Sequence, residues 1–194
     1  MCDINWEEIE EKLKNSLDNG RYRHTLGVSY TAAAIAMAHG CDVHKARLAG
    51  MLHDCAKSVP KENRIPMCEE YGIEVSECEK ENTGLLHSKL GVIIAERNYG
   101  IDDAEILGSI RWHTTGKPEM SILEQIIYIA DYIEPNRDME IGIPAEIRVS
   151  AFTDLDLCCA LIMKQIVSYL KNSSKKMDEM TVKACEFYCS KTGL

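Results

Sequence analysis

Aromatic residues and long apolar runs are both scarce in this 194-residue chain. Only two Phe and two Trp occur, although 45% of the residues are hydrophobic, so we expect a core of aliphatic side chains. No apolar stretch approaches the roughly 20 residues that a membrane-spanning helix needs. The stretch MCDINWEEIEEKLKNSLDNG at the start is charged and amphipathic, which argues against a signal peptide. We therefore expect no membrane partner.

The cysteines have no recognisable pairing pattern. Nine are scattered along the chain, none forms a CxxC pair, and Cys158 and Cys159 are adjacent. An odd number without paired spacing is typical of free thiols in a reducing compartment rather than of a disulfide framework. We therefore predict a cytoplasmic protein whose cysteines serve mainly as small core residues.

Basic residues are the minority among the charged ones. The chain has 22 Lys and Arg against 31 Asp and Glu, which gives a formal net charge of −9. An acidic chain is a poor general binder of nucleic acid or of an anionic membrane, so we expect no nucleic-acid partner. An anionic substrate would have to meet a local cluster of cations.

Strand alternation is hard to find, and helical periodicity dominates. The sequence predicts helix ends at Asn19-Gly20, Gly40, Gly72 and Gly100, N-caps at Asp42, Asp102, Ser121 and Asp154, and a helix that begins at Pro60. We predict an all-α, single-domain helical bundle over residues 1–194, with about 174–194 as a C-terminal docked helix. Apolar positions on the first and last helices would permit a homodimer, although such helices also pack within one chain.

Four of the six histidines lie on predicted helices among large apolar neighbours, and two aspartates share this setting. They are His24, His53, His87 and His113, with Asp54 in MLHDCAKSVP and Asp131 in IIYIADYIEP. Burying an ionised carboxylate is costly unless it is paired or coordinated. Each histidine alone would be an ordinary core residue, but the six side chains together indicate a shared metal ion.

The ligand types narrow the choice of metal. Neutral imidazole and carboxylate, without a recognisable thiolate pair, favour Fe, Mn, Co, Ni or Zn, whereas Mg is less suited to two or more imidazoles. His53 and Asp54 are about 100° apart around a helix. Both can face one ion only where the helix presents its edge to a cavity.

The strings around these residues resemble a known family. His24, the pair His53-Asp54 and Asp131, in this order on an all-α chain, resemble the HD-domain metallohydrolase superfamily. RYRHTLGV, LAGMLHDCAK, LLHSKLGVIIA, SIRWHTTG and IIYIADYIEPNRD are similar to bacterial YqeK-type HD proteins, from about residue 8 to about 190. The resemblance implies a hydrolase that cleaves diadenosine tetraphosphate symmetrically into two ADP.

The resemblance also implies roles for individual residues. It assigns a metal, typically iron, to His24, His53, Asp54 and Asp131, and it makes Asp54, His87 and His113 catalytic residues. His87 and His113 match histidines that either bind a second metal, bridged to the first by the aspartate of the HD pair, or contact the phosphates. Both alternatives stay open here.

An acidic protein needs cations at the site of a polyphosphate substrate. Basic residues near the motifs are Arg21, Arg23, Lys57, Arg111, Lys117 and Arg137. Arginine suits phosphate because its planar fork donates two parallel hydrogen bonds. The substrate contacts that we predict come from Arg21, Lys57, His87, His113, Thr114 and Arg137.

Other functions are compatible with the same pattern. An HD phosphohydrolase could act on another nucleotide, such as a guanosine alarmone or a cyclic nucleotide. A non-catalytic HD module could bind a nucleotide and regulate a partner, although that usually goes with lost ligands, and here the set is complete. A diiron oxygenase with these ligands would leave the basic residues unexplained.

Overall fold

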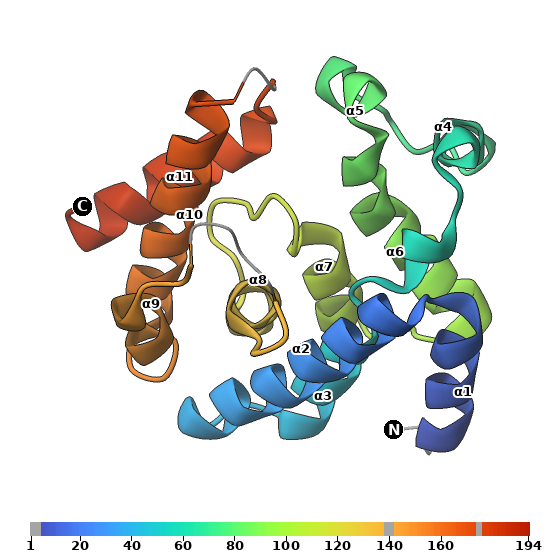
Figure 1. Cartoon of the computed structure of the whole chain (residues 1–194), viewed down its shortest axis with the longest axis horizontal. Coiled ribbons are helices and arrows are strands. Elements are labelled where there is room, and N and C mark those ends of the chain that lie inside the picture. The colour runs from blue at the N-terminus through green and yellow to red at the C-terminus, as the bar shows by residue number, and fades with distance from the viewer. Residues whose placement is uncertain (1–4, 138–141, 174–175) are drawn as a thin grey trace.

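The computed structural model describes residues 5–137, 142–173 and 176–194, and the regular secondary structure in these ranges is entirely helical. Figure 1 shows the arrangement. The α-helices are α1 (Trp6–Ser16), α2 (Asn19–Ala38), α3 (Val43–Leu52), α4 (Lys61–Glu70), α5 (Glu77–Glu81), α6 (Leu86–Tyr99), α7 (Ala104–Trp112), α8 (Ile122–Ile133), α9 (Ala145–Ser150), α10 (Leu155–Lys171) and α11 (Glu179–Thr192), and the 3-10 helices are η1 (Cys55–Ser58) and η2 (Thr83–Leu85). The all-α fold class is confirmed.

Most helix ends in the structure lie where the sequence predicts them. The side chains of Asp42, Ser121 and Asp154 accept hydrogen bonds from backbone amides at the starts of α3, α8 and α10. These bonds satisfy amides that have no partner inside the helix. At the other ends, Gly40, Gly72 and Gly100 have positive φ angles.

Three predicted boundaries differ from the structure. Asn19-Gly20 begins α2 instead of ending the first helix, because Asp18 accepts a hydrogen bond from the amide of Arg21 and so caps α2. Asp103, not Asp102, caps α7, since its side chain accepts from two amides of the first turn. Pro60 precedes α4 as its N-cap. Each shift is one to three residues.

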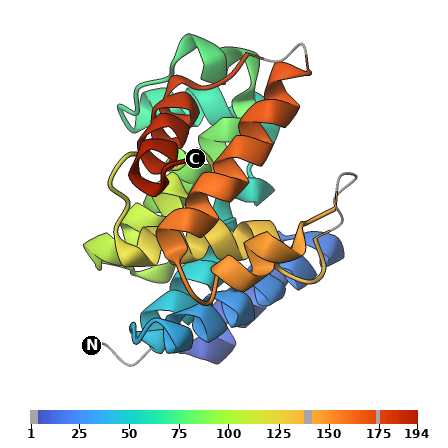
Figure 2. The ribbon, with the colours of Figure 1, turned by 90° about the vertical axis from the view of Figure 1, so that its left-hand side faces the viewer.

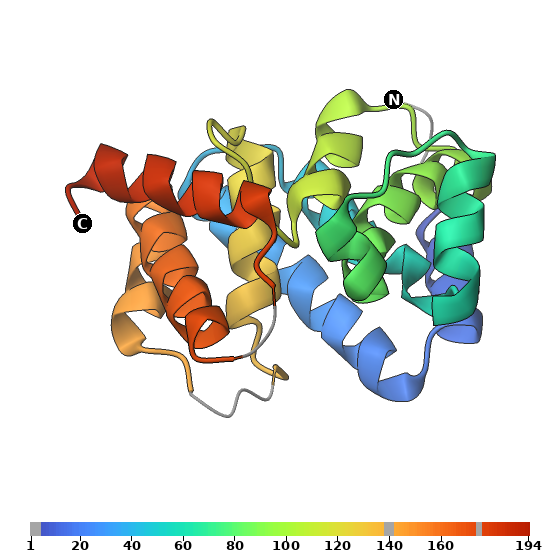
Figure 3. The same ribbon diagram turned by 90° about the horizontal axis from the view of Figure 1, so that it is seen from above.

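Helix α8 occupies the centre of the fold. It packs against α2, α3, α7 and α10, and Figures 1 and 3 show α9 to α11 on one side of it and α1, α4, α5 and α6 on the other. Nearly all its residues are buried. Asp131, near the end of this apolar helix, is therefore carried into the interior.

Helices α2 and α3 pack closely against each other. A Cβ atom at Gly50 of α3 would lie only 2.8 Å from the Cα atom of Ser29 in α2, so only glycine allows this approach. The close contact fixes α2, which carries His24, against α3, which ends at His53. This backbone packing thus brings together His24 and His53, which are far apart in the sequence.

The C-terminal helix α11 packs along α10, as Figure 2 shows. The ring of Tyr188 is fully buried, and its hydroxyl accepts a hydrogen bond from the amide of Met120. We infer one domain, because one hydrophobic cluster runs from Ile9 in α1 to Tyr188 in α11.

The state of the cysteines and the hydropathy of the helices are two further features of the described residues. All eight cysteines in these ranges carry free thiols, and four of them are buried. Within the same ranges, no helix combines the length and the apolar character needed to cross a bilayer.

Candidate metal centre and active-site cavity

The histidines and aspartates singled out from the sequence meet at one cavity of about 390 Å³. His24, Asp54, His87, His113 and Asp131 line it. The sixth, His53, is fully buried, and its Nε2 lies 3.7 Å from Asp54 Oδ2 and 3.8 Å from Asp131 Oδ1. The structure therefore brings together all six side chains.

Helix ends deliver several of these side chains. His53 follows the last residue of α3, and Asp54 precedes η1. His113 likewise follows α7, whereas His87 lies in the first turn of α6. As expected for the MLHD stretch, the apolar helix is buried and its end places an imidazole and a carboxylate side by side.

All four imidazoles are oriented by a hydrogen bond at Nδ1. The Nδ1 atoms of His53, His87 and His113 lie 2.6 to 2.7 Å from the carbonyl oxygens of the residues three positions earlier. His24 Nδ1 lies 2.9 Å from Glu134 Oε1. A carbonyl or carboxylate oxygen only accepts, so each Nδ1 carries a proton, and the lone pair of each neutral imidazole lies on Nε2.

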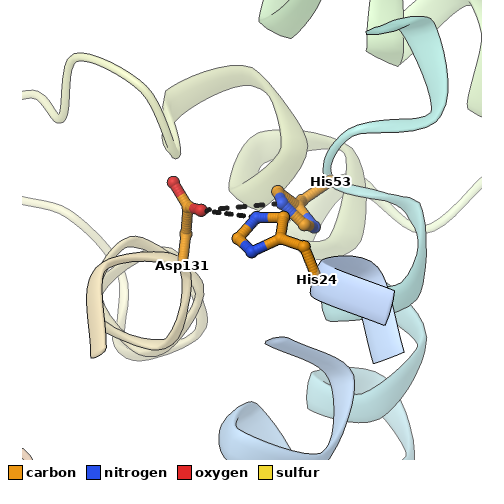
Figure 4. Close-up of side chains that lie close together, drawn as sticks. All are labelled: His24, His53 and Asp131. Carbon is orange, nitrogen blue, oxygen red and sulfur yellow. Dashed lines mark ion pairs between the residues drawn. The ribbon is translucent and has the colours of Figure 1, made fainter. Parts of the chain in front are cut away.

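The free Nε2 atoms fit a divalent cation. His24 Nε2 lies 3.0 Å from Asp131 Oδ1, as Figure 4 shows, and the buried His53 Nε2 has no hydrogen-bond partner in the described ranges. Two ligand atoms that are each about 2.1 Å from one ion lie roughly 3.0–3.4 Å apart. The observed separations of 3.0 to 3.8 Å are close to this, and a buried lone pair without a donor calls for a cation.

Asp54 lies between two groups of histidines. Its Oδ2 faces His53, whereas its Oδ1 lies 3.1 Å from His87 Nε2 and 3.4 Å from His113 Nε2. His87 Nε2 and His113 Nε2 are only 2.9 Å apart. Two lone pairs at this distance repel each other unless a proton or a cation lies between or beside them. The arrangement leaves room for either alternative given above for these two histidines.

Glu134 supports His24 from behind. This carboxylate is fully buried; its Oε1 accepts from His24 Nδ1, and its Oε2 accepts from the backbone amide of Asn136 at 2.7 Å and from Asn136 Nδ2 at 3.1 Å. A Cβ atom at Gly27 would lie 2.2 Å from Glu134 Oε2. Gly27 thus makes room for the carboxylate that orients His24, an arrangement common around metal-binding histidines.

Burial governs the protonation of the histidines. It lowers the pKa of His53 to about 4 and also lowers the pKa of His87. At His24 burial lowers the pKa too, but hydrogen bonds and charge from Asp131 and Glu134 outweigh it, so the pKa is raised. His53 and His87 are therefore neutral near pH 7, as metal ligands must be.

The two aspartates remain ionised despite burial. Burial raises the pKa of Asp54, but His53 and its other imidazole neighbours outweigh this effect, and the pKa lies well below its usual range. Burial likewise raises the pKa of Asp131, and the charge of Arg137 with the contact to His24 lowers it further than burial raises it. Neutral imidazoles beside ionised carboxylates are the donor set of a divalent transition metal.

Most of the residues expected to contact the substrate line the cavity. Lys57, Thr114 and Arg137 do so together with His87 and His113. Lys57 Nζ lies 3.8 Å from Asp54 Oδ1, and Thr114 Oγ1 lies within 3.2 Å of both histidine Nε2 atoms. Arg137 donates to the carbonyl oxygen of Asp131 at 2.6 Å and is ion-paired with its carboxylate.

Arg21 is placed elsewhere. Its side chain forms an ion pair with Asp18 at 2.9 Å on the surface, and it does not line the cavity. Arg21 and His24 are three residues apart, so they lie only about 60° apart around α2. Helical position alone therefore could not show that Arg21 pairs with Asp18 instead of lining the cavity.

Several residues of the site escaped the sequence analysis. Glu134, Asn136, Tyr128 and Tyr132 belong to it. The hydroxyl of Tyr128 is buried without a hydrogen-bond partner among the described residues, and the residue lines the cavity. The one sequence signal that could have pointed to Glu134 is an acidic residue directly before the helix-ending Pro135.

Comparison with known proteins gives matches along most of the chain. The model of the HD domain family matches residues 21–136, which include all six converging side chains. The symmetrical bis(5'-nucleosyl)-tetraphosphatase of Bacillus subtilis (strain 168) is 37% identical over 172 residues, which cover 89% of this chain and 91% of that protein. The protein of the same name from Halalkalibacterium halodurans is 40% identical over 153 residues, with coverages of 74% and 75%.

A solved structure has the same fold. A crystal structure from Clostridium acetobutylicum, described as a "predicted HD superfamily hydrolase involved in NAD metabolism", gives a TM-score of 0.90 at 39% identity. The superposition covers 96% of this chain and 97% of that one. The likeness therefore extends beyond the matched domain to the C-terminal helices.

Proposed function

The chain belongs to the HD-domain family, and from this premise we propose that it is a metal-dependent hydrolase that cleaves diadenosine tetraphosphate symmetrically into two ADP. Relatives that are 37% and 40% identical carry the name of this activity. The observation that supports it most strongly is the convergence of four Nδ1-protonated imidazoles and two ionised aspartates in one cavity.

We assign a divalent metal to His24, His53, Asp54 and Asp131. Iron is the preferred metal by family resemblance, and Mn, Co, Ni and Zn suit the same donors. A second ion at His87 and His113 would share Asp54 with the first. A divalent ion at such a site polarises a phosphoryl oxygen and makes water more acidic.

His87, His113 and Thr114 form the edge of the cavity next to Asp54. In the reading without a second ion, the Thr114 hydroxyl donates to a phosphoryl oxygen, and the Nε2 lone pair of a neutral histidine accepts a proton from the attacking water and then donates it toward the departing phosphate. Lys57 and Arg137 add positive charge for the polyphosphate. Arg137 must then contact the substrate while it remains paired with Asp131.

The bond that breaks depends on which part of the polyphosphate the cavity binds. Phosphoanhydride cleavage needs a nucleophile in line with the leaving group. A cavity that holds one nucleoside diphosphate unit places the bond to the next phosphate at the reacting centre. The leaving group is then also a nucleoside diphosphate, so both products are ADP.

The location and partners of the protein are part of the proposal. We place it in the cytoplasm, acting on a small dinucleoside polyphosphate and releasing ADP, without nucleic-acid or membrane partners, in keeping with the net charge of −9. A homodimer remains a proposal that a measurement of mass in solution would test.

An assay of the purified protein with a panel of nucleotides tests the function. Chromatography of the products from diadenosine tetraphosphate should show ADP alone. ATP and AMP in equal amounts would reject symmetric cleavage. Turnover of only a guanosine alarmone or a cyclic nucleotide would favour the other hydrolase reading, and tight nucleotide binding without any cleavage would favour the regulatory module.

A further inference from the structure

The catalytic cavity is too small for the whole of the proposed substrate. Its volume of about 390 Å³ lies near the lower end of the roughly 300–1,000 Å³ found for small-molecule sites. A dinucleoside tetraphosphate consists of two nucleoside diphosphate halves. The cavity can enclose one half, so the second nucleoside must lie on another surface that the polyphosphate can reach.

A second groove lies beside the cavity, between α2, the end of α8 and α9. It has a volume of about 460 Å³. One wall is a stripe of α2 that includes Tyr30, Thr31 and Ala34, and the other wall includes Asn136, Arg148 and Phe152. Figures 1 and 2 show these helices near one another.

Continuity with the catalytic cavity distinguishes this groove from the other hollows described. Asn136 lines both the cavity and the groove. A hollow between α6 and α7 and another beside α11 share no lining residue with the cavity. The groove therefore adjoins the cavity at Asn136.

The side chains of the groove suit a nucleoside. Tyr30 is 60% exposed and Phe152 is 43% exposed, and they come from different elements. Exposed aromatic rings in one hollow are a stacking platform for a base, and stacking accepts any base because every base has a π-face. Arg148 can stack in the same way or bind a ribose hydroxyl or a phosphate.

We infer that this groove binds the second nucleoside of the substrate, with Phe152 and Tyr30 stacking on its base. The inference rests on the proposed function and adds the site that favours a dinucleotide over a mononucleotide. Contacts far from the reacting phosphorus that are equal in the ground state and the transition state change KM and leave kcat unaltered.

Kinetics of Phe152→Ala test the inference. We expect KM for diadenosine tetraphosphate to rise about fivefold or more, the effect of losing one stacked base, with kcat unchanged. The inhibition constant of ADP should change less than twofold, since ADP fills the catalytic cavity. Phe152→Trp should restore the KM, and Tyr30→Ala should reproduce the loss.

Val149→Ala is the matched control. Val149 is 63% exposed on α9, three residues before Phe152, and does not line the groove, so the KM of this variant should equal that of the unaltered protein. The assignment of a nucleoside site would be overturned by an unchanged KM in both aromatic variants. Equal rises in KM and in the inhibition constant of ADP would overturn it as well. Loss of a dimer in Phe152→Ala would identify the groove as a contact between two copies instead.

The unaltered protein separates the two proposals. If it cleaves diadenosine tetraphosphate while the aromatic variants keep its KM, the groove assignment alone is rejected. If it does not cleave this substrate, the proposed function fails and the groove assignment fails with it.

Discussion

Replacing Glu134 by glutamine should weaken metal binding without changing any proposed ligand. The carboxylate is fully buried and accepts from His24 through one oxygen and from Asn136 through the other. Glutamine has the same shape but only one acceptor oxygen. This single oxygen can accept from His24 or from Asn136 but not from both, so one of these two donors loses its acceptor.

The size of the effect follows from the lost hydrogen bond. A hydrogen bond to a charged group contributes about 1.5–3 kcal/mol, which corresponds to a change of roughly 10- to 150-fold in an equilibrium constant. Partners of metal-bound histidines typically change metal affinity about 10- to 100-fold when they are mutated. We therefore expect Glu134→Gln to bind its metal about 10- to 100-fold more weakly.

A competitive chelator titration measures this affinity directly. The control is Glu124→Gln, because Glu124 is also a buried glutamate. It lies in the first turn of α8, caps that helix with Ser121 and pairs with Lys117 outside the cavity. This variant should lose some thermal stability and keep its metal affinity. Equal metal affinity in Glu134→Gln and the unaltered protein would refute the proposed positioning of His24.

Three other perturbations have expected outcomes. Asp54→Ala should lose the metal and the activity together, and full metal content by elemental analysis would remove Asp54 from the ligand set. His87→Gln and His113→Gln should each lower turnover about 10²- to 10⁴-fold with little change in thermal stability; unchanged hydrolysis with a clearly lower Tm would make them core residues. In the metal-free protein, burial holds the pKa of His53 near 4, below its ordinary 6.5, so the unfolded chain binds the proton first and the free energy of unfolding should fall from about pH 6.5 to pH 4, by on the order of 3 kcal/mol. The pKa of His24 is raised above its ordinary value, so its titration changes the free energy of unfolding only above about pH 6.5. Urea denaturation with a chelator gives the profile, and a flat one over this range would contradict the burial argument.

Much of the fold could be predicted because its signals are local. Asp42, Ser121 and Asp154 cap helices through amides two or three residues away, and such bonds depend only on the order of residues along the chain. The corrected cap at Asp103 shows the limit of this reasoning, since two neighbouring aspartates offer the same group and packing selects one.

The residue types of the candidate site were also readable from the sequence. An imidazole next to a carboxylate after an apolar run is costly to bury without a partner, so the strings around His53 and Asp131 indicated a cation. The sequence left open whether Asp54 faces two groups of histidines, which the family resemblance offered as one alternative. That depends on where the ends of α3, α6 and α7 meet.

Only the tertiary structure decided which side chains support and extend the site. His24 and Glu134 are 110 positions apart, and Arg21, three residues from His24, forms an ion pair on the surface instead. Asn136 lines both the cavity and a groove whose walls include residues from three helices. Contacts between distant segments depend on the angle and depth at which helices pack, and close approaches such as those at Gly27 and Gly50 set these for α2. The sequence determines such packing only through all the side chains of the core acting together, which no short motif contains.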